Sequence, residues 1–273
     1  MSKIQLTYCQ SQKLKILLIC NKIPSEFNYQ LFDCYDITLQ LPPCFPDLNL
    51  IYNIWGLMKK KRWQQVGIRI GQSEIQSLGQ EFQKSQNMKK LLFVLNNNFL
   101  DVQGGHFLGN SLAKCFNISH LEIDLSENNK GAQGITNLGE QIGNCQNLVS
   151  SNLNLNLNQI GDGQSLGFGQ GLGKSNSISS LSIDFSHNYV NGFQPTYECL
   201  VSLSDNENLS DLTLSFNFSM LHCSAALGLG EGLDQLKKLT RLMLNLKYNQ
   251  SNDYGVQQLA AGIRSCKNLK SYS

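Results

Sequence analysis

The sequence predicts an α/β solenoid, a right-handed horseshoe with parallel strands on its concave face and helices on its convex face. Three observations predict this fold: a fixed period of about thirty residues, an alternating apolar segment followed by Asn, and a helical apolar stripe. Counted from Leu121, equivalent positions recur every 30 or 31 residues. They are Leu91, Leu121, Ser151, Leu181, Leu212 and Leu242, and Tyr272 begins a further unit.

Each unit begins with a segment in which apolar and polar residues alternate. Leu121, Ile123 and Leu125 show the pattern, and the same positions are apolar in the units that begin at Leu181, Leu212 and Leu242. A period of two predicts a strand with one buried face. An Asn follows seven residues after the first position, and its side chain can bond the backbone of a turn. These residues are Asn98, Asn128, Asn158, Asn188 and Asn249, with Ser219 in the remaining unit.

The second half of each unit predicts a helix. Leu138, Ile142 and Cys145 are spaced four and three residues apart, which places them on one helical stripe. A Gly such as Gly139 recurs after the first residue of the stripe in most units. Because Gly within a helix costs about 1 kcal/mol relative to Ala, we expect neighbouring helices to pass too closely there for a side chain.

The unit resembles the leucine-rich repeat family. The segment from Ile118 to Asn128 carries the L-x-x-L-x-L-x-x-N core with two extra strand residues. The helix and the unit length resemble the ribonuclease-inhibitor-like class. The resemblance covers about residues 63–273 and implies a horseshoe that binds proteins, but it names no partner, because family members bind very different ones.

The chain is predicted to have two parts. Residues 63–273 form the solenoid of about six thirty-residue units, beginning with a degenerate strand at 66–70 and ending on an incomplete unit. Residues 1–62 are predicted to cap its first unit, with strands at 14–20 and 37–41 and a helix at 48–58. The basic run at 59–62 suits the end of that helix, and nuclear localisation or phosphate binding are the alternatives.

The candidate binding surface is the concave face, whose side chains stand between the buried strand positions. It is polar and weakly acidic around Glu122, Asp124 and Asp184, which favours a basic or polar protein segment and disfavours nucleic acid. A solvated face without a tight ligand is the simpler alternative. The candidate protein-binding residues are His120, Glu122, Asp124, Asn152, Asn154, Asp184, Asp211, Arg241, Met243 and Lys247. A fourth outward row is expected at Asn96, Ser126, Asn156, Ser186, Asn217 and Lys247.

Catalytic and cofactor-binding patterns are absent from the sequence. His120, Glu122 and Asp124 alternate on one strand and offer a weak metal alternative, since strong sites use donors from separate elements. The Gly-rich run 167–173 lacks the Lys-Ser/Thr pair of a phosphate loop, and it falls on repeat helix positions. We therefore expect no catalytic residue, no metal and no cofactor.

Composition bears on the environment of the protein. The net charge is +2, with +4 in residues 1–62 and −2 in the remainder, far from the basicity of a dedicated nucleic-acid binder. Nine scattered cysteines without a Cys-x-x-Cys pair predict reduced thiols. The apolar run at 14–20 is too short to cross a membrane. These features predict an intracellular protein, either cytoplasmic or part of a cytoskeletal assembly.

The sequence thus predicts a non-catalytic protein-interaction module, a scaffold or a structural subunit of a larger assembly. Binding would use the concave face or the sheet edge at 268–273, where the next strand should start and a partner could pair end-on. The alternative is a regulator or inhibitor of an enzyme that acts through the concave face.

Overall fold

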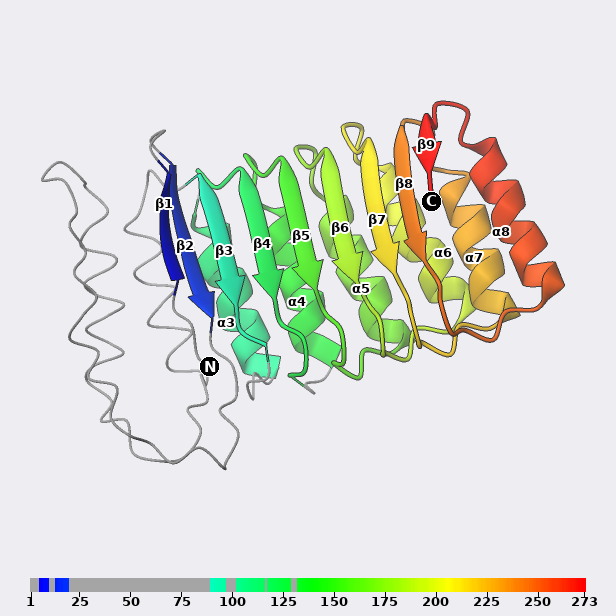
Figure 1. Cartoon of the computed structure of the whole chain (residues 1–273), viewed down its shortest axis with the longest axis horizontal. Coiled ribbons are helices and arrows are strands. Elements are labelled where there is room, and N and C mark those ends of the chain that lie inside the picture. The colour runs from blue at the N-terminus through cyan, green and yellow to red at the C-terminus, as the bar shows by residue number, and fades with distance from the viewer. Residues whose placement is uncertain (1–4, 10–12, 20–88, 97–101, 116, 129–131) are drawn as a thin grey trace, which may run out of the picture.

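The computed structural model describes residues 5–9, 13–19, 89–96, 102–115, 117–128 and 132–273. They form one nine-stranded sheet with a layer of helices along one of its faces (Figure 1). The strands are β1 (Gln5–Cys9), β2 (Lys13–Ile19), β3 (Lys90–Val94), β4 (His120–Asp124), β5 (Ser150–Asn154), β6 (Ser180–Asp184), β7 (Asp211–Ser215), β8 (Arg241–Asn245) and β9 (Ser271–Tyr272). The helices are α3 (Val102–Ala113), α4 (Ala132–Gly143), α5 (Asp162–Gly173), α6 (Phe193–Ser204), α7 (Cys223–Leu233) and α8 (Asp253–Ser265).

The sheet follows the order of the chain from β1 to β9. Every pair from β2 onward is parallel, and one helix connects each successive pair from β3 to β9. The register matches the predicted units, with Leu121 beside Ser151 and Leu181 beside Leu212. The prediction of an α/β solenoid is therefore confirmed.

The N-terminal part adds two strands to this sheet. The strand predicted at 14–20 is confirmed as β2, which pairs in parallel with β3 and antiparallel with β1. The sequence did not predict β1. It is β2 that lies next to β3, whereas the predicted strands at 37–41 and 66–70 and the helix at 48–58 lie outside the described residues. A division of the chain at residue 62 stays a prediction.

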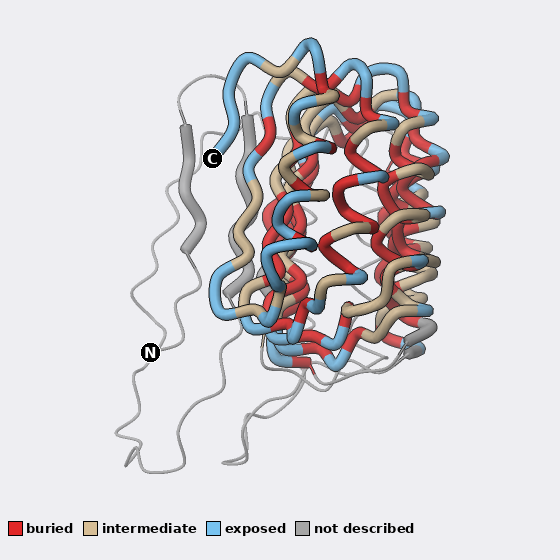
Figure 2. The backbone as a smooth tube through the Cα atoms, turned by 90° about the vertical axis from the view of Figure 1, so that its right-hand side faces the viewer, coloured by how far each residue is buried: buried red, intermediate tan, exposed pale blue. Residues whose placement is uncertain are grey.

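The core lies between the sheet and the helices, where the two predicted apolar patterns meet. Leu138, Ile142 and Cys145 of the helical stripe are buried, as are Leu121 and Ile123 of the preceding strand. Figure 2 views the molecule from the C-terminal end, and the last unit is mostly exposed or intermediate whereas the units behind it carry the buried residues. Each Å² of apolar surface that is buried stabilises the fold by about 25 cal/mol. Burial between stacked units is therefore the main contribution to stability.

Neighbouring helices touch through glycine, as the sequence predicted. A Cβ atom on Gly139 of α4 would lie 2.5 Å from the carbonyl oxygen of Phe168 in α5. Gly230 of α7 meets the carbonyl oxygen of Gln258 in α8 at the same distance. Both contacts are with backbone, which cannot move aside easily, so only Gly fits. The thirty-residue spacing of glycines thus reflects the close approach of helices.

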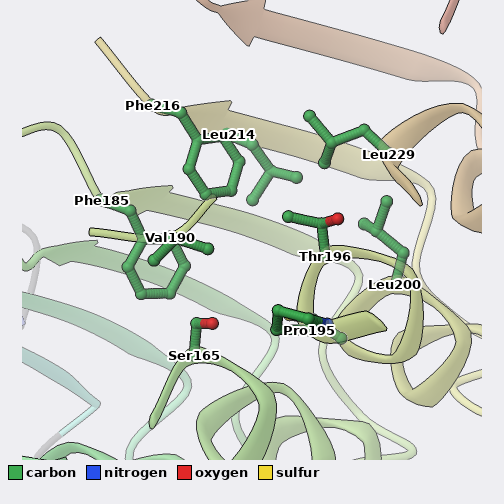
Figure 3. A pocket seen from close by; sticks show the side chains of 10 residues that line it. Ser165, Phe185, Val190, Pro195, Thr196, Leu200, Leu214, Phe216 and Leu229 are labelled. Atoms are coloured by element: carbon green, nitrogen blue, oxygen red, sulfur yellow. The ribbon is translucent and has the colours of Figure 1, made fainter. Parts of the chain in front are cut away.

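A small cavity of about 10 Å³ lies inside the core between β6, β7 and α6 (Figure 3). Phe185 and Phe216 form one side of it, and their rings stack with centroids 5.5 Å apart. Pro195 and Thr196 of α6 lie opposite. The space is about that of one water molecule and has an apolar lining, so it is a packing defect and not a ligand site.

Candidate protein-binding face

The candidate site is the sheet face opposite the helices, called here the open sheet face and defined by the outward side chains of β4 to β8. Strand register aligns these side chains in rows across the units. The first row is His120, Ser150, Ser180, Asp211 and Arg241. The second is Glu122, Asn152, Ser182, Thr213 and Met243, and the third is Asp124, Asn154, Asp184, Ser215 and Asn245.

The second row is the most accessible part of this face. The side chains of Glu122, Asn152 and Met243 are exposed, whereas those of Ser182 and Thr213 between them are half-buried. His120 in the first row is also exposed, and its Nδ1 atom lies 2.9 Å from the Ser119 hydroxyl. These residues stand at the surface where a partner could reach them.

The carboxylates of the third row accept hydrogen bonds from the turns that follow their strands. Asp124 accepts the backbone amide of Ser126 at 3.0 Å and its hydroxyl at 2.7 Å, both through Oδ1. Asp184 accepts the amide of Ser186 at 2.8 Å in the same way. Asn154 takes this role in β5. Residues that sequence reasoning assigned to binding therefore also fix the chain where each strand ends.

The fourth row faces outward only in part: Asn96, Asn156 and Asn217 are half-buried and Lys247 is exposed, but the two serines of the row are not accessible. Ser126 and Ser186 are buried, and Ser186 accepts the backbone amide of Asn217 at 3.1 Å through its hydroxyl. Ser126 and Ser186 already belong to the turn that follows each strand, so the strand alternation no longer applies. Lys247 is the exposed member of the row among those described, and its backbone amide donates to Asn217.

One ion pair crosses the first row between neighbouring units. Arg241 Nη1 lies 3.1 Å from Asp211 Oδ2, and most of the arginine side chain is exposed. Such an exposed pair contributes about 0–1 kcal/mol to stability. The charges of these two predicted binding residues therefore cancel each other. Glu122 remains as an exposed acidic side chain at the N-terminal end of the face.

The described residues form no cluster suited to binding a metal ion. Nowhere in this part of the chain do three His, Cys, Asp or Glu side chains gather as a metal site would require. Burial raises the pKa of Cys115 and of Cys199 to about 12, so both thiols stay protonated. None of the described helices is long and apolar enough to cross a membrane.

Sequence reasoning missed a second exposed surface, along the loops that follow the strands. The residue before each turn Asn, or before Ser219 in its unit, is exposed, and in successive units these residues are Glu127, Leu157, His187, Phe218 and Tyr248. The His187 and Phe218 rings stack with centroids 4.6 Å apart, and those of Phe218 and Tyr248 at 4.3 Å. The sequence carried a signal for this surface, because an apolar or aromatic residue precedes the turn position in the last four of these units, outside the strand and helix patterns.

The repeat motif and the observed parallel units together define a leucine-rich-repeat-type fold. No protein-family model matches the sequence. A search of curated proteins also finds no match. Among solved structures, the fold is similar to internalin C2 from Listeria monocytogenes str. 4b F2365, with 20% sequence identity and a TM-score of 0.40. That match covers 84% of this chain and 93% of the internalin chain.

Proposed function

We propose that this protein is a non-catalytic protein-interaction module that acts as a scaffold or structural subunit. The observation that carries the proposal is the open sheet face, a continuous array of outward side chains held in strict register over five strands. Such a surface suits an extended partner, because each unit presents an equivalent position to it. Helices in every described unit agree with the ribonuclease-inhibitor-like class.

A basic or polar segment of a partner protein fits this face best. Glu122 is exposed, and Asp124 and Asp184 add negative charge in the next row. The face lacks a buried aromatic anchor among its described outward residues, so charge and hydrogen bonding would dominate the contact. We expect binding to weaken with salt for this reason.

Photo-crosslinking tests whether a partner occupies the face. A photoreactive residue at Asn152 or Met243 in the full chain should form adducts with the partner in a lysate of the source cell. The same residue at Gln170, which is exposed on α5 on the opposite side, is the control. Equal adducts at Gln170 and at the two face positions would refute binding through the open sheet face.

Charge substitutions then test the proposed chemistry without disturbing the turns. Asp124→Asn and Asp184→Asn keep a side-chain oxygen for the Ser126 and Ser186 amides, whereas Lys at either position would remove it. The triple variant Asp124→Asn, Asp184→Asn and Glu122→Gln should lower the affinity for the partner identified by crosslinking at least about tenfold. Unchanged affinity in a folded variant would rule out a basic partner.

The outer edge of β9 is a second candidate contact, for a partner strand. Ser271 donates to Thr240 and Ser273 to Leu242, so the Tyr272 amide between them faces the outer edge. Tyr272→Pro removes that donor and leaves both bonds to β8 in place. If Tyr272→Pro abolishes binding of a partner strand but keeps crosslinking at Asn152, pairing at the edge is supported. If the strand still binds, pairing at the edge is excluded.

A further inference from the structure

The loops after β4 to β8 carry a continuous ladder of exposed side chains, called here the loop-edge ladder. It consists of Glu127, Leu157, His187, Phe218 and Tyr248. All five precede the turn position of their units, and Figure 1 shows the strands ending along one edge of the sheet. The side chains of Phe218 and Tyr248 are 46% and 74% exposed, although both are aromatic.

The backbone of the ladder is in an unusual conformation for these residues. All five have φ between 53° and 59°, the left-handed region. Leu, Phe and Tyr are costly there by about 1–2 kcal/mol, whereas Gly or Asn would make the same turn more easily. The turn therefore does not explain why apolar side chains occupy these positions. Outliers of this kind point to a function of the side chains.

Further apolar side chains widen the ladder on the same loops. Tyr189 and Met220 stand two residues beyond His187 and Phe218, and both are about half exposed. Together with Leu157, Phe218 and Tyr248 they make up five of the ten strongly exposed large apolar side chains among the described residues. Apolar surface concentrated along one edge in this way marks an interaction site.

The charges at the two ends of the ladder indicate what occupies it. The first rung is Glu127, and the last rung, Tyr248, follows the exposed Lys247. If a second copy lies antiparallel with a two-fold axis at His187, Leu157 of one copy meets Phe218 of the other. Glu127 then meets Tyr248 beside Lys247 at both ends. Equal strand spacing of about 4.8 Å keeps all five rungs in step over the length of the ladder.

We propose that the loop-edge ladder is a self-association surface that joins two copies of this chain in an antiparallel, two-fold dimer. The contact is isologous, so each apolar rung and each charged end is used twice. A ladder of five rungs is small for an interface, and the dimer is therefore expected to be weak and reversible. This surface is separate from the open sheet face, and neither proposal depends on the other.

Sedimentation of the full chain at about 1 to 500 µM tests the proposal. The wild type should shift from monomer to dimer within this range. Phe218→Asn and Tyr248→Asn keep a residue that tolerates the left-handed backbone while removing the ring, and each should weaken the dimer at least about tenfold. Val149→Thr, which changes an exposed apolar side chain at the start of β5, at the other end of the strands from the ladder, is the control and should leave the dimer unchanged.

A charge swap tests the antiparallel register. Glu127→Lys and Lys247→Glu should each weaken the dimer several-fold, and the double variant should restore it to near the wild-type value. Because both side chains are exposed, all three variants should fold, which circular dichroism can verify. A wild type that stays monomeric at 500 µM, ring variants that dimerise normally, or a double variant that fails to recover would each overturn the proposal.

Discussion

Asn188 Oδ1 accepts the backbone amide of Asn158 from the preceding unit at 3.0 Å and that of Ile160 at 2.9 Å. Its Nδ2 group donates to carbonyl oxygens of both units, at Leu155 and at Phe185. Asn158 bonds Asn128 in the same way. The turn residues therefore tie each unit to the next through buried hydrogen bonds, in addition to the sheet and the apolar core.

Replacing Asn188 with Ala should destabilise the protein by about 3 kcal/mol or more, because buried amides and carbonyls of two units lose their partner. Urea unfolding monitored by circular dichroism measures the change. Asn152→Ala on the open sheet face is the matched control, since that side chain is exposed, and it should change stability by less than about 0.5 kcal/mol. Similar losses for the two variants would contradict the inter-unit role.

The row of turn Asn residues that links successive units is interrupted at Ser219. The Ser219 hydroxyl bonds the carbonyl oxygen of Phe185 at 3.1 Å, as an Asn side-chain amide does in the other units. Serine lacks the second polar atom with which Asn188 and Asn249 accept amides of the preceding unit. Ser219→Asn should therefore add a hydrogen bond to the amide of Asn188 and raise the free energy of unfolding by about 1 kcal/mol.

The same urea experiment checks this variant, with Ser182→Asn as the control. Ser182 lies half-buried on the open sheet face, where an added amide has no turn to satisfy. A loss of stability in Ser219→Asn would mean that the neighbouring core has no room for the larger side chain.

Periodicity predicted the fold well because one pattern serves every unit. The positions of Leu121, Asn128 and Gly139 follow from a strand, a turn and a helix contact that repeat with fixed geometry. The pattern could not predict β1, which pairs antiparallel outside the repeat. The repeat pattern also did not predict the environment of Ser151, which stands at a leucine position. Its side chain is buried, and its hydroxyl has no hydrogen-bond partner.

The candidate site was less predictable, because exposure depends on where the chain leaves the strand. Alternation places Glu122 and Asp124 on the same face, but only the structure shows that Asp124 also accepts a backbone amide of the following turn. Extending the alternation to Ser126 failed, since that residue already belongs to the turn that follows the strand. The aromatic stack from His187 to Tyr248 depends on a left-handed backbone that no periodicity records.

The contact between α4 and α5 offers a direct test of the glycine explanation. A Cβ atom on Gly171 would lie 2.3 Å from the backbone nitrogen of Glu140, and a shift of the helix would disturb Gly143, which faces the Gly171 carbonyl oxygen. Gly171→Ala should therefore cost about 3 kcal/mol or more, at the upper end for an overpacked site.

Gly163 lies in the first turn of the same helix and provides the control. An added Cβ there meets nothing within 4 Å, so Gly163→Ala should stabilise the protein by about 0.4–1 kcal/mol through the lower entropy of the unfolded chain. Thermal unfolding of the two variants should give melting temperatures on opposite sides of the wild type. A destabilised Gly163→Ala or a neutral Gly171→Ala would contradict the packing described for α5.

The buried thiols should make the protein sensitive to alkali. Burial raises the pKa of Cys115 and of Cys199 to about 12, and that of Cys145 to about 11. In the unfolded chain these thiols ionise near their ordinary value, so between about pH 9 and pH 11 the unfolded state binds fewer protons than the folded state. Their contribution to stability is complete below this range and is lost as the pH rises through it.

The free energy of unfolding should accordingly fall by about 1 kcal/mol per pH unit for each buried thiol in this window. Urea titrations at pH 8, 9 and 10 of the wild type and of Cys199→Ala measure the slope, which should be shallower in the variant. Cys223→Ala, at a half-buried position, controls for the loss of a sulfur atom. Because the three proteins differ in no other titratable side chain, a common slope would show that burial does not hold the Cys199 thiol protonated.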